Sequence, residues 1–164
     1  MATVTATSRR TASSTIGKGE AGTLKGLGVR TIELSPSASG TIVDFQLRIP
    51  SNLRINQSSR LYHDDLATSG SPTLDLGLYA VDGNITSDDD CLNDGIALSS
   101  ASTANVGVQV VKDHANAGKF AWEFVNGQTS DPGGFFDVKG IIRDAATIGA
   151  AGNTITLDLQ GYLD

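Results

Sequence analysis

The stretch Thr-Leu-Asp-Leu-Gly-Leu-Tyr-Ala-Val-Asp-Gly-Asn, residues 73–84, predicts the strand against which the rest of the chain packs. Its apolar side chains recur at every second position from Leu74 to Ala80, while the intervening positions hold Asp, Gly and Tyr. Because successive side chains of a strand point to opposite faces, this alternation indicates a strand with one face in an apolar core. The run ends at residues 82–84, whose types favour a tight turn. We therefore expect a central strand here.

Other parts of the chain have the same extended, partly alternating character. The further predicted strands are Val29–Leu34, Thr41–Ile49, Leu53–Ile55, Arg60–Leu66, Val106–Val111, Phe135–Ile142 and Thr154–Leu163. Seven or eight short, irregularly spaced strands with little helix are typical of two packed antiparallel sheets. We predict an all-β fold, an antiparallel, jelly-roll-like β-sandwich with at most one or two short helices.

Two segments bear on the helix content. Residues 114–125 suit either a short helix or a strand, and we favour the helix. Asp88–Asp90 opens a segment ending near Leu98, which we expect to begin with a helical turn because Asp is favoured at helix N-termini.

The chain divides into an arm and a body. Residues 1–30 have few apolar side chains, so they cannot offset their own ordering entropy, and we expect an extended arm before a single domain at 31–164. Residues 1–60 hold eight Lys or Arg and three Asp or Glu, a net +5, whereas residues 61–164 hold four and fifteen, a net −11. An acidic body disfavours nucleic acid as a partner.

No membrane association is expected, because no run of eighteen apolar residues occurs. The first ten residues contain no hydrophobic segment after their charges, which predicts synthesis without a secretory signal.

Residue types for catalysis are sparse. The only histidines are His63 and His114, and no serine lies in a nucleophile-elbow motif. Cys91 is the single cysteine, so it forms neither an intramolecular disulfide nor a cysteine metal site, and we interpret it as a half-buried apolar residue. We predict a protein that is not an enzyme and has no cofactor.

One loop imitates a calcium site. Oxygen-bearing residues alternate at Asp82, Asn84, Thr86 and Asp88. The glycine, however, stands second instead of sixth, and no Glu stands twelfth, so we favour a solvated turn and predict no metal.

Several short motifs carry a resemblance to a known family. They are Leu-Arg-Ile-Pro-Ser-Asn-Leu-Arg-Ile (47–55), Leu-Tyr-His-Asp-Asp-Leu (61–66), Asp-Leu-Gly-Leu-Tyr-Ala-Val-Asp-Gly (75–83), Asp-Asp-Asp-Cys-Leu (88–92), Phe-Ala-Trp-Glu (120–123), Ser-Asp-Pro-Gly (130–133) and a closing strand with Tyr162. In this order, over roughly residues 41–164, the chain resembles the small capsid decoration (cement) proteins of tailed bacteriophages. All are strand and turn residues, and the arm lies outside the resemblance.

The resemblance implies a non-enzymatic virion protein, made in the host cytoplasm, that binds the outer surface of the expanded phage capsid. Its expected partners are the major capsid protein and neighbouring copies of itself, with a trimer favoured. We expect the arm to contact the shell through basic side chains and apolar anchors, namely Arg9, Arg10, Ile16, Lys18, Leu24, Lys25, Leu27 and Arg30.

Two functions of other classes stay open. A carbohydrate-binding or host-attachment module of the virion requires an exposed aromatic platform or a bound calcium ion. A hydrolase requires a cleft with convergent polar groups.

Overall fold

The computed structural model describes residues 3–5, 25–34, 38–82, 86–102, 107–144, 148 and 152–163. This part of the chain forms ten strands: β1 (Thr3–Thr5), β2 (Lys25–Glu33), β3 (Ile42–Pro50), β4 (Leu53–Ile55), β5 (Arg60–His63), β6 (Thr73–Ala80), β7 (Asp88–Ala97), β8 (Val108–Gln109), β9 (Phe135–Arg143) and β10 (Thr154–Leu163). A 3₁₀ helix, η1 (His114–Asn116), and a short α-helix, α1 (Ala121–Phe124), precede β9.

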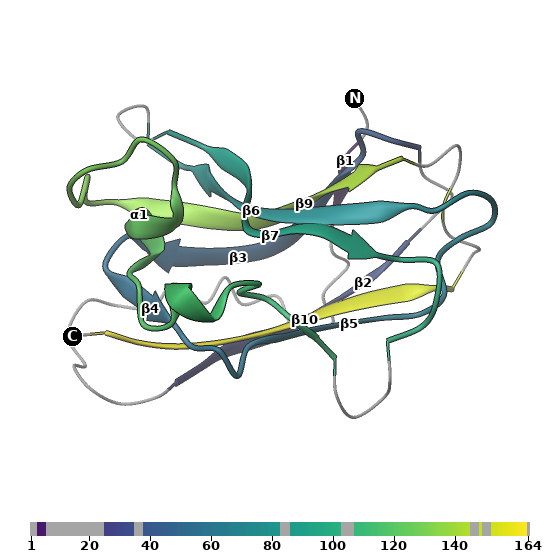
Figure 1. The fold of residues 1–164 in the computed structure, drawn as a ribbon, viewed down its shortest axis with the longest axis horizontal. Helices are drawn as coiled ribbons and strands as arrows, with labels where there is room; N and C mark the ends of the chain where they lie inside the picture. Colours follow the sequence, from purple (N-terminus) through teal and green to yellow (C-terminus); the bar gives the residue numbers. More distant parts are fainter. Residues whose placement is uncertain are drawn as a thin grey trace.

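The strands form two sheets that lie as two layers (Figure 1). Sheet A has the order β1-β3-β9-β6-β7, and sheet B has the order β2-β10-β5-β8, with β4 also paired to β10. Every pair is antiparallel except β1 and β3, which run parallel. The predicted all-β sandwich is confirmed.

From β2 onward the chain passes repeatedly between the layers. Strands β2, β4, β5, β8 and β10 belong to sheet B, whereas β3, β6, β7 and β9 belong to sheet A. The jelly-roll path stays an interpretation, which this alternation favours.

The core lies between the two sheets and is lined by their inward-facing apolar side chains. In β10 every second residue is buried, from Ile155 to Leu163. In β3 the buried set runs from Val43 to Ile49, although the strand carries a bulge between Asp44 and Leu47. That bulge adds two residues opposite β9, an even number, so the inward face is preserved.

Strand β6 lies between β9 and β7, so the strand predicted from Leu74 to Ala80 is confirmed as an internal strand, while Gly83 and Asn84 of the predicted turn lie outside the described residues. Leu74, Leu76 and Leu78 are fully buried. The outer face of β6 is covered as well, because β7 begins directly over Gly77. A Cβ atom added to Gly77 would lie 2.1 Å from the carbonyl oxygen of Asp88, so only glycine fits under this crossing.

The segment at Asp88 is a strand, so the helical turn expected there is wrong. The N-terminal preference of Asp is a local effect worth about 1 kcal/mol, and it is overridden by the pairing with β6, which begins at Asp88 and continues, with two shifts of register, to Ala97. The helix favoured within residues 114–125 is confirmed as η1 and α1. The amide of Phe120 donates to Oε2 of Glu123 at 2.7 Å, which holds the first turn of α1.

The predicted boundary between arm and body at residue 30 is wrong. Strand β2 begins at Lys25 and pairs with β10, six residues before the expected start of the domain at 31, and β1, within the predicted arm, pairs with β3. Sequence reasoning missed this because the strand is irregular at Leu27 and Gly28. The register shifts at this point, and Gly28 has a φ of 139°, so no two-residue period is visible.

In the described part of the chain, no helix has the length and apolar character needed to cross a membrane.

Candidate functional site

The predicted arm residues fall into two groups. Arg9, Arg10, Ile16, Lys18 and Leu24 lie outside the described residues. Lys25 pairs with Gly161 as the first residue of β2. Leu27 and Arg30 lie in the sandwich itself.

A partner contact through Leu27 or Arg30 is contradicted by burial. Leu27 is 3% exposed and packs in the core, where a Cβ at Gly161 would lie 3.3 Å from its Cδ1 atom. Arg30 is 9% exposed, and its guanidinium lies beside Gly28. Both side chains therefore serve the interior of this chain.

A hollow of about 540 Å³ lies on sheet B where β5 and β10 run side by side. It is lined by Tyr62, His63, Asp64, Ala101, Ser102, Thr154 and Thr156. β5 ends at His63 and β10 begins at Thr154, so the antiparallel pairing brings their polar residues to one end of the sandwich.

The histidine of this hollow is held by backbone groups. Its ring Nδ1 lies 2.9 Å from the carbonyl oxygen of Asp64, which can only accept, so Nδ1 carries the proton. Ser102 Oγ accepts from the backbone amide of His63 at 2.8 Å and donates to its carbonyl at 3.2 Å. Ser102 therefore fixes the loop to β5, and its hydroxyl makes no bond to the imidazole ring.

The second histidine is equally remote from a nucleophile. His114 lies in η1, with Nδ1 3.3 Å from Nε2 of Gln57. Among the described residues, neither imidazole is hydrogen-bonded to a hydroxyl, a thiol or a carboxylate. The pairing of nucleophile and base that acyl-transfer chemistry needs is not formed by these two rings.

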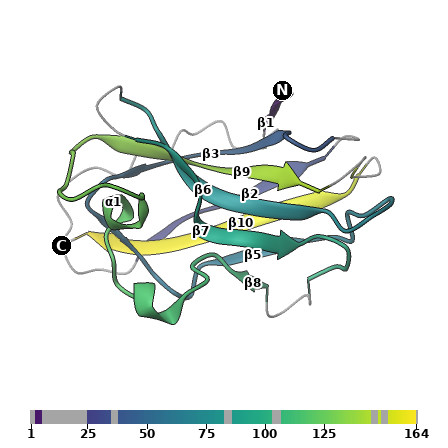
Figure 2. The same cartoon turned by 45° about the horizontal axis from the view of Figure 1, so that its top comes forward.

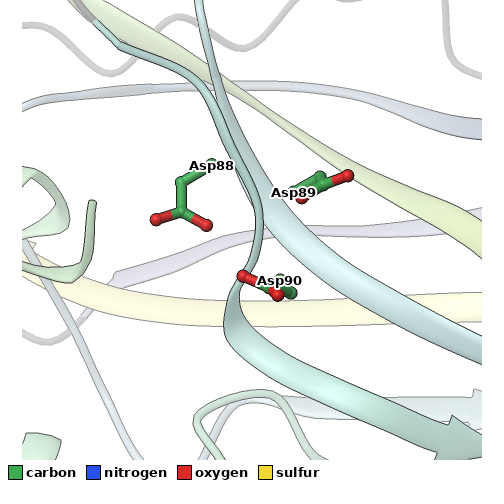
Figure 3. A group of neighbouring side chains, drawn as sticks. All are labelled: Asp88, Asp89 and Asp90. Carbon is green, nitrogen blue, oxygen red and sulfur yellow. The ribbon is translucent and has the colours of Figure 1, made fainter. Parts of the chain in front are cut away.

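An acidic cluster marks the start of β7. The carboxylates of Asp88, Asp89 and Asp90 offer oxygen atoms within 4.8 Å of one another (Figure 3). Asp88 accepts the amide of Asn126 at 2.8 Å, and Asp89 accepts from Arg143 at 2.6 Å. A hydrogen bond with Asp88 raises the pKa of Asp90 above its usual value. The protein's own donors therefore engage two of the three carboxylates, and we assign no metal here.

The calcium-like loop predicted from the sequence is described only in part. Asn84 lies outside the described residues, while Asp82 and Thr86 are exposed.

The outer face of sheet A is a surface of paired charges. Arg48 bonds Asp137 through Nε at 2.8 Å, and Lys139 lies 3.3 Å from Asp44. Arg143 bonds both Asp75 and Asp89. In each of these pairs a basic side chain neutralises an acidic one.

Cys91 is partly buried and packs against the core, as interpreted from the sequence. Burial strongly raises the pKa of its thiol, which keeps it protonated and weakly nucleophilic near neutral pH.

Sequence reasoning missed the hollow, because its residues come from three separate segments. In the motif Leu-Tyr-His-Asp-Asp-Leu at 61–66, residue types alone single out the histidine and not the side chains beside it. Tyr62 and Asp64 matter through their positions opposite Thr154 and Thr156, and this depends on the register of β5 against β10. No spacing in the chain encodes that register.

Comparison with protein-family models, with curated proteins and with solved structures finds no match to this chain.

Proposed function

We propose that this chain is a non-enzymatic structural protein of a tailed-phage virion, which binds the outer surface of the expanded capsid and bridges its subunits. The proposal rests on the motif order between residues 41 and 164, together with an all-β sandwich that provides a stiff body. Its partners are the major capsid protein and neighbouring copies, arranged as a trimer. The body does not bind nucleic acid, because residues 61–164 carry a net charge of −11.

The observation that carries the proposal is the placement of the amino-terminal region at two separate sheet edges. Strand β1 adds to the edge of sheet A beside β3, whereas β2 forms the edge of sheet B (Figure 1). Residues 6–24 connect these two edges, and they include Arg9, Arg10 and Lys18. The described residues that flank this segment, Thr5 and Lys25, lie in different sheets, and we propose that the basic side chains between them contact the capsid surface.

Affinity comes from several weak contacts acting together. Each exposed ion pair between an arm cation and a capsid carboxylate contributes only about 0–1 kcal/mol. Apolar contacts by Ile16 and Leu24, and simultaneous binding by linked copies, supply the remainder. A protein that binds only the assembled shell stabilises that shell by mass action.

The test is co-sedimentation of the purified full-length chain with expanded, undecorated heads of the encoding phage, with unexpanded proheads as the control. We expect saturable binding to expanded heads alone, at a fixed ratio to the capsid subunit. Equal binding to both particles, or to neither, contradicts the proposal.

The arm is tested by a deletion that ends at residue 24, which leaves β2 intact. We expect this variant to lose at least tenfold in affinity for expanded heads. The matched comparison is a full-length chain with Arg9, Arg10 and Lys18 replaced by Gln, which separates the charge contribution from the apolar one. Unchanged binding by the deletion variant would remove the arm from the mechanism.

A further inference from the structure

We propose that the hollow between β5 and β10 binds a neutral saccharide, which gives the protein an adhesive function separate from capsid binding. The hollow measures about 540 Å³, within the range of roughly 300–1,000 Å³ that small-molecule sites occupy. It lies at the end of the sandwich where β5 ends and β10 begins, so it is built on paired strands.

A carboxylate in the hollow is already oriented. Oδ2 of Asp64 accepts from the backbone amide of Thr154 at 2.7 Å and from its hydroxyl at 3.0 Å. The other oxygen, Oδ1, has no hydrogen bond within the described part of the chain. Asp64 is exposed, so this oxygen offers a fixed acceptor to a ligand hydroxyl group.

Hydroxyl groups lie beside this carboxylate. The hydroxyl of Thr154 donates to Asp64 and keeps its lone pairs for a ligand donor. The hydroxyl of Thr156 is 2.9 Å from that of Thr31 on β2, which fixes its rotamer. Groups that donate and accept at fixed positions are the groups that recognise a polyol.

An aromatic ring completes the lining. Tyr62 is half-buried and is one of the residues that line the hollow. Gly107 lies close against this ring, since a Cβ at Gly107 would be 2.9 Å from Cε1 of Tyr62. The contact sets the position of the ring, whose electron-rich face attracts the polarised C–H groups of a pyranose.

Charge selects a neutral ligand. Among the described residues no Lys or Arg lines the hollow, and the one carboxylate that lines it, Asp64, is exposed. The negative charge of this carboxylate repels a phosphorylated, sulfated or sialylated sugar. The ligand class is therefore a neutral glycan, such as the hexoses and N-acetylhexosamines of cell-surface polysaccharides.

The experiment is saturation-transfer difference NMR on the free full-length protein, with methyl glycosides of glucose, galactose, mannose, fucose and N-acetylglucosamine as probes. We expect at least one to bind with a dissociation constant near 1 mM, a typical strength for a single small sugar in an open site. Sialyllactose and glucose 6-phosphate are the anionic comparisons. A failure to bind any neutral probe, or a preference for an anionic one, overturns the proposal.

Variants locate the site. We expect Tyr62→Ala and Asp64→Asn each to weaken binding at least tenfold, while Tyr162→Ala, which removes a half-buried tyrosine from β10 outside the hollow, leaves it unchanged. Binding that survives both of the first two substitutions contradicts the proposal. Circular dichroism and the melting temperature of each variant establish that it is folded.

A glycine pair tests the ring position without removing the ring. Gly107 and Gly127 both have a positive φ, 57° and 80°, but a Cβ at Gly127 would meet nothing within 4 Å. Both alanine variants carry backbone strain, whereas only Gly107→Ala pushes the Tyr62 ring. We expect a loss of glycoside binding at least fivefold greater in Gly107→Ala than in Gly127→Ala. Equal effects in the two variants count against an aromatic platform at Tyr62.

The glycoside experiment is independent of the capsid experiment, because it measures binding to the free protein. If the chain binds expanded heads but none of the glycosides, the adhesive function is refuted and the capsid function is not.

Discussion

Tyr79 shows how the crossing of β7 over β6 changes the chemistry of one side chain. It lies on the outer face of β6, and its hydroxyl is inaccessible and has no hydrogen-bond partner in the described structure. Lys139 lies 5.7 Å from the ring centroid. Burial, reinforced by the negative charge of Asp89, raises the pKa of Tyr79 to about 12.

This raised pKa predicts a loss of stability at alkaline pH. Between about pH 10 and 12 an unfolded tyrosine has ionised while folded Tyr79 still holds its proton, so a rise in pH favours the unfolded state. We expect Tyr79→Phe to flatten the decline in unfolding free energy over this window, as measured by urea denaturation at successive pH values. Tyr162→Phe is the control, and a decline of the same steepness in both variants would contradict the assignment.

At the level of elements, one arginine ties three strands of sheet A together. Arg143 at the end of β9 donates from Nε to Asp75 of β6 at 2.8 Å and from a terminal nitrogen to Asp89 of β7 at 2.6 Å. Asp75 also accepts the amide of Gly95 at 3.0 Å. The bond to Asp75 raises the pKa of the Arg143 guanidinium. Each carboxylate oxygen of Asp75 thus accepts a hydrogen bond, one from Gly95 and one from Arg143, and the side chain is only 10% exposed.

The two aspartates differ in solvent exposure, which predicts different costs on removal. Asp75→Ala leaves the amide of Gly95 without its acceptor and Arg143 with a single carboxylate partner. We therefore expect the free energy of unfolding to fall by about 2–4 kcal/mol. The side chain of Asp89 is 41% exposed, so we expect Asp89→Ala to lower the free energy of unfolding by about 1 kcal/mol or less. Chemical denaturation measures both.

A double-mutant cycle supplies the check. Combining each aspartate substitution with Arg143→Met isolates the pairwise coupling, which we expect to be larger for Asp75 than for Asp89. The reverse order would show that burial does not govern this network.

The elements that sequence alone predicted are those whose alternation the fold leaves intact. Thr154–Leu163 matches β10 at both ends, and β3 keeps its pattern because its bulge adds an even number of residues. Strand β7 was missed because its register with β6 shifts twice and because three consecutive aspartates favour a helix start. Its identity comes from the tertiary contact with β6, over Gly77.

For the whole molecule, the important correction is where the folded body begins. Leu27 and Ile32 of β2 are both buried in the shared core, and β2 covers the edge of β10. Residues 25–30 therefore belong to the cooperative unit, although their composition resembles that of the preceding arm.

Two truncations measure this boundary. We expect deletion of residues 1–24 to leave a folded protein, since within the described structure it removes only the three-residue strand β1. Deletion of residues 1–30 removes Leu27 and most of the pairing with β10, and we expect loss of the cooperative thermal transition. The measurement is the melting curve of each variant by circular dichroism. Leu27→Ala provides an intermediate case, and we expect it to lower the free energy of unfolding by about 2–5 kcal/mol. Equal melting temperatures for both deletions would restore the boundary at 31.

Strand β7 has one further consequence, for behaviour at high concentration. It is the last described strand of sheet A, and such a border strand is the usual starting point for fibre growth. Strand β7 lies beside β6 (Figure 2), and its bulges interrupt any regular run of free amides and carbonyls. The backbone amide of Lys112 already donates a hydrogen bond to the carbonyl of Leu92. A strand from another molecule finds no continuous template there, so this border resists amyloid-type growth even when many copies are crowded together.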